Sequence, residues 1–339
     1  MARIYLTDTT LRDGSHTVSH QFSPEDVAKV AKALDEAGID LIEIGHGDGL
    51  TGSTINYGFS DYKELDVIRA AAGVVKRAKV TVLLIPGIGS VEDLEEAVHA
   101  GATAVRVATH VTEADVAEQH IKAAKKMGLW TVGFLMMAHM ADPATVLQEA
   151  KKMESYGADV VYCTDSAGAM LPADVTEKIS LLKANLSIPV GFHSHNNLGL
   201  AIANSVAAVD AGATYIDGSL SGLGAGAGNT ATDTLVAVFN RMGIEHGADL
   251  YKTMDASTEA LAPVLAAKGV NAQTNLDALI CGYAGVYSSF MLHARRASAR
   301  FGVDVRDILI ELGRRRAVGG QEDWIIEVAS DLAEAKKKQ

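Results

Sequence analysis

The chain has 339 residues, 48% of them hydrophobic and 21% charged, which is typical of a soluble globular protein with a large core. Its formal net charge of −12 argues against a nucleic-acid-binding surface, because phosphate binding requires a basic stripe. The two cysteines, Cys163 and Cys281, have no metal-finger spacing and suit a reducing compartment. No signal peptide or membrane-spanning run is present, so we expect a cytoplasmic protein with no nucleic-acid or membrane partner.

Apolar, β-branched segments alternate with amphipathic helical stretches from the N-terminus onward. The first strand is expected at Ile4–Asp8, and the first helix begins after Ser23 with a proline and two acidic residues in its first turn. That helix ends at Gly38, and a glycine recurs just after later helical stretches, at positions 101, 128, 157 and 212. This alternation predicts a parallel sheet covered by helices.

Eight strands are expected, each followed by a helix, with a repeat of roughly thirty residues. They are residues 4–8, 39–44, 80–85, 104–108, 131–136, 160–164, 190–193 and 215–218. This number of units predicts a (β/α)8 TIM barrel. The alternative is a doubly wound open sheet, but no Gly-x-Gly-x-x-Gly opens a helix directly after a strand.

The strand signal stops near residue 255, and helical periodicity continues without strands over residues 283–301, 304–316 and 322–335. We therefore expect a TIM-barrel catalytic domain over residues 1–258 and an all-helical domain over residues 259–339. The helical domain could be a lid, a plug at the barrel end or a partner-contacting unit.

Polar residues gather at the positions where the expected strands end, which is where barrels of this kind carry their active sites. These positions hold Arg12, Asp13, His16, Glu43, His46, Asp48, His110, His139, Asp165, Ser166, His193 and His195. Six of the eleven histidines are among them. The sequence therefore predicts a functional site at this end of the barrel.

His193 and His195 would share one face of a strand, about 7 Å apart, which is close enough to bind one metal ion. With Asp13 they would supply two neutral nitrogens and one carboxylate. No lysine lies at a strand end for a Schiff base, since Lys79 precedes its strand. The same ligand set occurs in non-haem iron oxygenases, and paired strand-end histidines can also be merely hydrogen-bonded, so these residues alone leave the chemistry open.

A resemblance narrows these alternatives. The run Thr7-Asp8-Thr9-Thr10-Leu11-Arg12-Asp13-Gly14 resembles the signature of metal-dependent carbon–carbon lyases and synthases that share a TIM barrel. Further matching motifs occupy residues 15–16, 46–50, 84–89, 106–110, 224–229, 285–289 and 318–323. Over essentially its whole length the chain resembles the 4-hydroxy-2-oxovalerate aldolases of aromatic or sterol meta-cleavage pathways, in the DRE-TIM metallolyase superfamily.

The resemblance implies that Asp13, His193 and His195 bind a divalent metal, usually Mn²⁺. A 4-hydroxy-2-oxoacid substrate would chelate this metal through its carboxylate and keto oxygens. His16 would take the C4 hydroxyl proton, the C3–C4 bond would break, and the metal and Arg12 would stabilise the pyruvate enolate. An aldehyde would leave.

The resemblance also implies substrate contacts from both expected domains. A tyrosine of the helical domain would close the site, and we match it to Tyr287 in preference to Tyr283. The substrate-contacting residues would be Arg12, Asp13, Ser166, His193 and Tyr287.

Other residues at this end of the barrel receive lesser roles. For His46, His110 and His139 we expect supporting or packing positions. The glycine-rich run 222–229 could be a phosphate-binding loop, but we expect a tight loop near the metal, with Asn229 as an outer ligand or a substrate contact.

The resemblance further implies a hetero-oligomer with an acylating acetaldehyde dehydrogenase, which would receive the aldehyde through a channel. The helical domain would dock this partner, and Gly319 and Gly320 would leave room near the channel entrance. Two other functions remain as alternatives. One is a Claisen-type acyl-CoA/2-oxoacid synthase of the same superfamily, and the other is a non-catalytic scaffold subunit.

Overall fold

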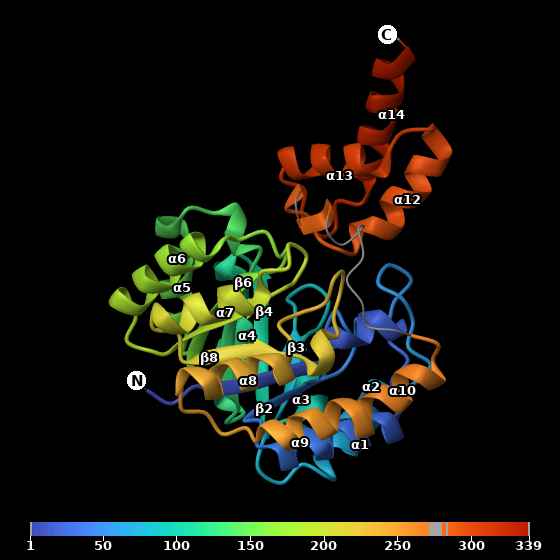
Figure 1. The fold of residues 1–339 in the computed structure, drawn as a ribbon. Coiled ribbons are helices and arrows are strands. Elements are labelled where there is room, and N and C mark those ends of the chain that lie inside the picture. The colour runs from blue at the N-terminus through green and yellow to red at the C-terminus, as the bar shows by residue number, and fades with distance from the viewer. Residues whose placement is uncertain (1, 271–279, 283, 338–339) are drawn as a thin grey trace.

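Eight parallel strands form one closed barrel, in which each strand pairs with its neighbours in the sequence (Figure 1). The computed structural model describes residues 2–270, 280–282 and 284–337. The strands are β1 (Tyr5–Leu11), β2 (Leu41–Ile44), β3 (Lys79–Leu84), β4 (Ala104–His110), β5 (Trp130–Met136), β6 (Val160–Asp165), β7 (Val190–Ser194) and β8 (Tyr215–Gly218). The predicted (β/α)8 barrel is confirmed.

An outer layer of helices covers the strands. It consists of α1 (Pro24–Ala37), α2 (Glu64–Ala72), α3 (Val91–His99), α4 (Glu118–Lys126), α5 (Pro143–Tyr156), α6 (Pro172–Asn185), α7 (Ala201–Asp210) and α8 (Thr232–Met242). The ends of α1 show how the sequence sets these boundaries. Ser23 and Asp26 exchange side-chain and backbone hydrogen bonds in a capping box, and Gly38 adopts a φ of 90° that ends the helix.

Three further helical turns pack on the barrel after α8. They are α9 (Leu250–Asp255), the π-helical turn η5 (Ala256–Leu261) and α10 (Ala262–Ala267). Their buried side chains, including Leu261 and Leu265, belong to the same apolar cluster as the barrel helices. The expected boundary between residues 258 and 259 therefore falls within η5, in a segment that packs with the barrel.

The last helices form a separate unit beyond one end of the barrel (Figure 1). They are α12 (Phe290–Phe301), α13 (Val305–Arg314) and α14 (Asp323–Lys337), with an apolar core of their own. Within the segment 283–301, for which helical periodicity was expected, α12 begins only at Phe290, and Gly285 has a φ of 70°. Tyr287 consequently lies in an irregular connection. Tyr283 lies outside the described residues.

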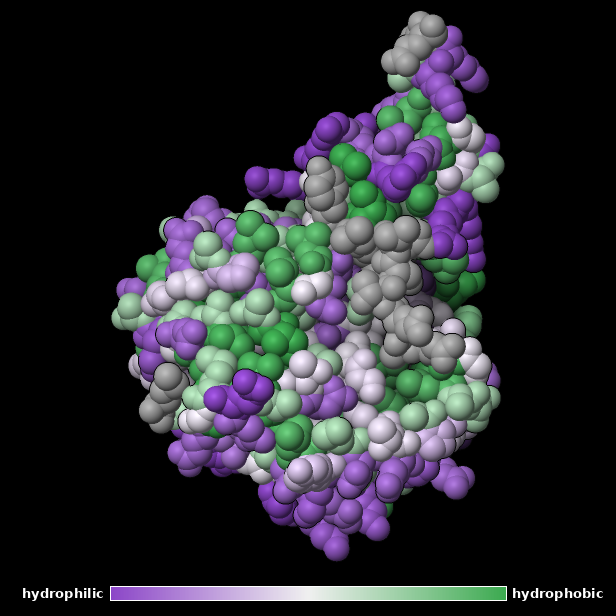
Figure 2. All heavy atoms as spheres, viewed as in Figure 1, coloured by the Kyte–Doolittle hydropathy of each residue, from purple (hydrophilic) through white to green (hydrophobic). Residues whose placement is uncertain are grey.

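Two hydrogen bonds show that this helical unit faces the carboxyl ends of the strands. A ring nitrogen of His139, which follows β5, lies 3.1 Å from the carbonyl oxygen of Gly285. The side-chain amide of Asn197, which follows β7, donates to the Ser288 hydroxyl at 3.1 Å. The outer end of the unit is mainly hydrophilic (Figure 2). In the described part of the chain, every helix is too short or too polar to cross a membrane.

Candidate metal and catalytic centre

The structure brings Asp13, His193 and His195 to one buried point at the carboxyl end of the barrel. Asp13 Oδ2 lies 3.7 Å from His193 Nε2 and 3.5 Å from His195 Nε2. A register shift between Asp8 and Leu11, where β1 pairs with β2, precedes the short helical turn that begins at Asp13. The two histidines come from the end of β7, as their alternate spacing predicted.

Hydrogen bonds fix which nitrogen of each imidazole carries the proton. His193 Nδ1 lies 2.7 Å from Asp217 Oδ2, and His195 Nδ1 lies 3.4 Å from the carbonyl oxygen of Ala225. Both partners accept, so each Nδ1 donates, and in the neutral ring each Nε2 would turn its lone pair toward Asp13. Two imidazole nitrogens and a carboxylate thus converge on one point, an arrangement that a bound cation would stabilise.

The protonation states of this group suit a divalent metal. Burial raises the pKa of Asp13, but the Arg12 guanidinium and the neighbouring imidazoles lower it more, so the carboxyl stays ionised. Burial lowers the pKa of His195 to about 4, so its imidazole is neutral at pH 7. A carboxylate and neutral imidazoles are donors that Mn²⁺, Fe²⁺ and Zn²⁺ accept.

The glycine-rich loop 222–229 folds against this group. The Ala225 amide donates to Asp13 Oδ1 at 3.0 Å, and the Asn229 amide donates to the Gly222 carbonyl oxygen at 3.0 Å. Gly228 is required, because a Cβ there would lie 1.8 Å from the Gly222 oxygen. The amides of Ala227 and Gly228 also have acceptors within the protein. The loop therefore supports the triad and offers little of the free amide array that a phosphate would need.

Asn229 lies beside the triad, as expected for an outer position. It forms an isolated bridge with His195, and its side-chain amide donates to Thr9 at 3.2 Å. Its Oδ1 atom is buried and has no hydrogen-bond partner among the described residues. This oxygen is available to accept a hydrogen bond from a ligand in the centre.

The guanidinium of Arg12 is held next to Asp13 by three acceptors. Its Nε donates to Glu43 at 2.9 Å, and its Nη1 donates to Asp13 at 3.1 Å and to the Gly47 carbonyl oxygen at 3.2 Å. Arg12 is buried, so its positive charge acts in a low-dielectric surrounding. This geometry places a fixed cation beside the candidate metal ligands.

His16 is half-buried above Gly47, where a Cβ would come within 2.4 Å of His16 Nε2. His16, His20 and Asp48 form a second group whose ligand atoms lie within 4.8 Å of one another. The ring of His20, which the sequence did not single out, stands edge-on to His16 at 4.9 Å and stacks on His46 at 3.7 Å. His46 thus supports His20, which agrees with the packing role expected for it.

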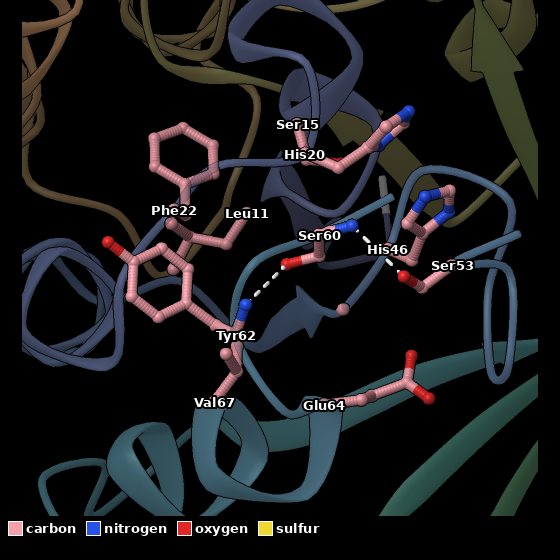
Figure 3. A pocket seen from close by; sticks show the side chains of 11 residues that line it. Leu11, Ser15, His20, Phe22, His46, Ser53, Ser60, Tyr62, Glu64 and Val67 are labelled. Carbon is pink, nitrogen blue, oxygen red and sulfur yellow. Dashed lines mark hydrogen bonds between the residues drawn. The ribbon is translucent and has the colours of Figure 1, made fainter. Parts of the chain in front are cut away.

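A backbone amide donates to one imidazole of this second group, that of His20, and another amide donates to the neighbouring His46 ring. The Gly47 amide donates to His20 Nδ1 at 3.3 Å, and the Asp48 amide donates to His46 Nδ1 at 3.1 Å. Burial lowers the pKa of His20 to about 3 and that of His46 to about 4. Both rings are neutral parts of the wall, and beyond them lies a pocket that they line with side chains such as Ser53 and Glu64 (Figure 3). A metal bound to His20 would have to displace the hydrogen bond from the Gly47 amide.

Of the remaining expected residues, Ser166 belongs to the barrel and Tyr287 to the helical unit. Ser166 is buried and accepts from the Met137 amide at 3.0 Å. Burial and the nearby charge of Glu113 raise the pKa of Tyr287, so its hydroxyl stays protonated. A Cβ on Gly319 would lie 3.9 Å from the Tyr287 ring, whereas Gly320 has open space around it.

His110 and His139 each have a buried ring nitrogen that finds no partner among the described residues. The other nitrogen of His110 lies 2.9 Å from the Thr112 hydroxyl. The other nitrogen of His139 lies 3.1 Å from the carbonyl oxygen of Gly285. His110 is therefore anchored by a local contact and His139 by a contact with the helical unit.

Comparisons with known proteins cover nearly the whole chain. Residues 3–260 match an HMGL-like family model, and residues 272–334 match a DmpG-like communication domain. The chain is 57% identical over 336 residues to a 4-hydroxy-2-oxovalerate aldolase of Carboxydothermus hydrogenoformans. The matched region covers 99% of this chain and 99% of the relative. The chain is also 57% identical to the protein of that name in Geobacillus thermodenitrificans, with 98% of this chain and 96% of the relative covered.

Solved structures show the same fold at low identity. A putative aldolase domain from Bacteroides vulgatus has a TM-score of 0.71 at 24% identity and covers 84% of this chain and 94% of its own. The carboxyl transferase domain of Rhizobium etli pyruvate carboxylase has a TM-score of 0.81 at 15% identity and covers 99% of this chain and 61% of its own. At such identities the likeness concerns the fold alone.

Proposed function

The chain belongs to the family of the 4-hydroxy-2-oxovalerate aldolases, which are carbon–carbon lyases, and from this premise we propose a metal-dependent reaction at the centre described above. The enzyme cleaves 4-hydroxy-2-oxopentanoate, or a longer 4-hydroxy-2-oxoacid, to pyruvate and an aldehyde. The observation that carries the proposal is the convergence of two imidazole nitrogens and an ionised carboxylate beside the Arg12 guanidinium.

Asp13, His193 and His195 would hold the divalent ion, for which we propose Mn²⁺. When bound, the ion supplies Lewis-acid stabilisation to the carboxylate and keto oxygens of a chelating 2-oxoacid. We assign it to this group because the Nε2 atoms of both histidines face Asp13, whereas in the second group the Gly47 amide already donates to His20.

Side chains of the protein carry out the proton transfer, stabilise the developing charge and bind the substrate. His16 accepts the proton of the C4 hydroxyl, the aldehyde C=O forms at C4 as the C3–C4 bond breaks, and the electrons of that bond form the enolate, with its charge on the C2 oxygen. The aldehyde leaves, and uptake of one proton at C3 of the enolate gives pyruvate. The buried charge of Arg12 stabilises that enolate oxygen. Ser166 binds the substrate, and the protonated Tyr287 hydroxyl donates to it from the helical side.

The test is pyruvate release from 4-hydroxy-2-oxopentanoate, coupled to lactate dehydrogenase. We expect activity to vanish after chelation and to return with Mn²⁺. Undiminished activity in the chelated protein would refute the metal dependence. Release of free CoA thiol from acetyl-CoA and a 2-oxoacid, without any pyruvate release, would favour a Claisen-type synthase instead.

We also propose that the aldehyde passes to an acylating acetaldehyde dehydrogenase bound at the helical unit, within the catabolism of aromatics or sterols. The match of residues 272–334 to a DmpG-like communication domain supports this partner. Co-purification of the two proteins is the test, and a chain that stays alone in the presence of the dehydrogenase would contradict it.

Gly319 allows a sharper test of channelling than Gly320. The φ of 90° at Gly320 would strain any larger residue there, whereas Gly319 is outside the positive-φ region. Gly319→Leu should impair aldehyde transfer more than cleavage. Equal losses in transfer and cleavage would argue against a channel at this position.

A further inference from the structure

A charged cluster occupies the interior of the barrel, below the candidate metal ligands. Arg106 on β4 has a relative exposure of 0%, and its two terminal nitrogens donate to the two carboxylate oxygens of Asp217 on β8, each at 2.6 Å. Arg106 Nη1 also lies 3.6 Å from Glu43 Oε2 on β2. Bulky apolar side chains usually fill the interior of such barrels, so these buried charges need an explanation.

Each carboxylate of this cluster contacts one residue of the candidate centre. Asp217 Oδ2 accepts from His193 Nδ1 at 2.7 Å, and Glu43 Oε2 accepts from Arg12 Nε at 2.9 Å. The Asp217 contact fixes the tautomer of a proposed metal ligand. The Glu43 contact fixes the guanidinium proposed to stabilise the enolate. Arg106 is the cation shared by these two contacts.

Two aromatic rings hold the Arg106 guanidinium in place. Its Cζ atom lies 4.9 Å from the centre of the Phe134 ring and 4.7 Å from that of Tyr162. The Tyr162 hydroxyl lies 3.2 Å from Thr7 Oγ1. A planar guanidinium suits both the stacking and the two-pronged contact with Asp217, whereas a lysine ammonium could provide neither.

We propose that Arg106 is a positioning residue that aligns both halves of the centre, holding His193 through Asp217 and Arg12 through Glu43. Without the Arg106 guanidinium, buried Asp217 would lose its two-pronged cation, and Glu43 would keep Arg12 but lose its second cation. Asp217 would then be free to turn away from His193, and Glu43 from Arg12. The inference rests on the proposed metal-dependent cleavage, because it assigns Arg106 to the ligands and the cation of that reaction.

Three variants separate the two halves. Arg106→Lys keeps a charge but loses the two-pronged contact with Asp217. Asp217→Asn alters the contacts of Asp217 with His193 and Arg106 but leaves the contact between Glu43 and Arg12. Glu43→Gln alters the contacts of Glu43 with Arg12 and Arg106 but leaves the contact between Asp217 and His193. Thr131→Val is the control, because Thr131 is equally buried near the start of β5, where its hydroxyl donates to the Leu129 carbonyl oxygen. Calorimetry measures the Kd of Mn²⁺ for the metal-free proteins, and the pyruvate assay measures kcat and KM.

Asp217→Asn should weaken Mn²⁺ binding roughly 10- to 100-fold, as loss of an outer partner of a metal ligand does. Glu43→Gln should lower kcat and leave the Kd of Mn²⁺ unchanged. Arg106→Lys should show both losses, and ¹⁵N spectra of its metal-free form should show His193 losing the single Nδ1-protonated tautomer. Thr131→Val should match the wild type in all measurements.

A folded Arg106→Lys protein with the wild-type Kd, kcat and His193 spectrum would overturn the inference. If that variant does not fold, Asp217→Asn and Glu43→Gln provide the test. A raised Kd of Mn²⁺ in the first and a lowered kcat in the second support the proposal, whereas wild-type values of Kd and kcat in both variants overturn it. A wild-type protein that neither binds Mn²⁺ nor releases pyruvate would instead refute the proposed function.

Discussion

The barrel interior and the helical unit bury different kinds of side chain. The barrel encloses Arg12, Asp13, Arg106 and Asp217, all charged and all paired. The core of the helical unit is apolar, built from side chains such as Phe290, Leu312 and Ile325. Buried charge is costly, so it is found where chemistry needs fixed polar groups, and the helical unit keeps its charges at the surface.

Arg315 is an example of the partly exposed ion pairs of the helical unit. It bonds to Glu311, Glu327 and Asp331 from a partly exposed position. Such pairs contribute roughly 0–1 kcal/mol each, so the stability of the unit rests on its apolar core. The two regions should therefore respond differently to the same kind of substitution.

His195→Ala should produce the largest effect on activity. It removes one of three proposed metal ligands, so pyruvate release should fall by more than ~100-fold, beyond the loss expected for an outer partner. The thermal midpoint of the metal-free protein should change little. If His195→Ala keeps most of its Mn²⁺-dependent activity, the buried polar groups of the barrel do not have the catalytic role that distinguishes them from the core of the helical unit.

Phe290→Ala should lower the stability of the helical unit and leave metal binding by the barrel unchanged. Deleting this buried ring should destabilise the helical unit by roughly 3–5 kcal/mol, while the barrel keeps its Mn²⁺ affinity. Circular dichroism and calorimetry would check both parts, with the exposed Leu292→Ala of the same helix as the matched control. Loss of Mn²⁺ binding in Phe290→Ala would show that the two regions fold as one.

Alkylation of the two cysteines can report the unfolding of the two regions separately. Burial raises the pKa of Cys163, on β6, and of Cys281, in the helical unit, to about 12, so neither thiol should react in the native protein. In rising urea Cys281 should be alkylated first, because the smaller core exposes less surface on unfolding and is less stable. Mass spectrometry of labelled peptides would identify the order, and simultaneous labelling would contradict it.

Asn197→Ala should produce the smallest effect. The Asn197 amide donates to Ser288 and to the Ala167 carbonyl oxygen, each at 3.1 Å, and thereby joins the helical unit to the barrel. Its side-chain oxygen also accepts from the Ala227 amide at 2.9 Å. Loss of these three hydrogen bonds should cost roughly 0.5–1.5 kcal/mol each, measured by urea unfolding. Ser288→Ala removes only the contact between regions, so a larger effect from Ser288→Ala would contradict this assignment.

The sequence predicted most of the fold because the signals for it are local. Alternating strands and helices, and glycines such as Gly38, determine the boundaries from neighbouring residues alone. The spacing of His193 and His195 likewise placed both imidazoles on one side of a strand. The start of α12 at Phe290 was not predicted, because the helical periodicity of the sequence already begins at residue 283.

The supporting charges could not be predicted in the same way. Arg106 and Asp217 are 111 residues apart and meet only because closure of the barrel sets their positions. His20 was missed because its partners, His16 and His46, come from two different loops. Pairings of this kind depend on register and loop geometry, which no local pattern encodes.

The most direct test of the central claim is to locate the metal in crystals grown with Mn²⁺. The account predicts one anomalous-scattering peak between Asp13, His193 and His195. A peak between His16, His20 and Asp48 instead, or no peak at saturating Mn²⁺, would contradict it.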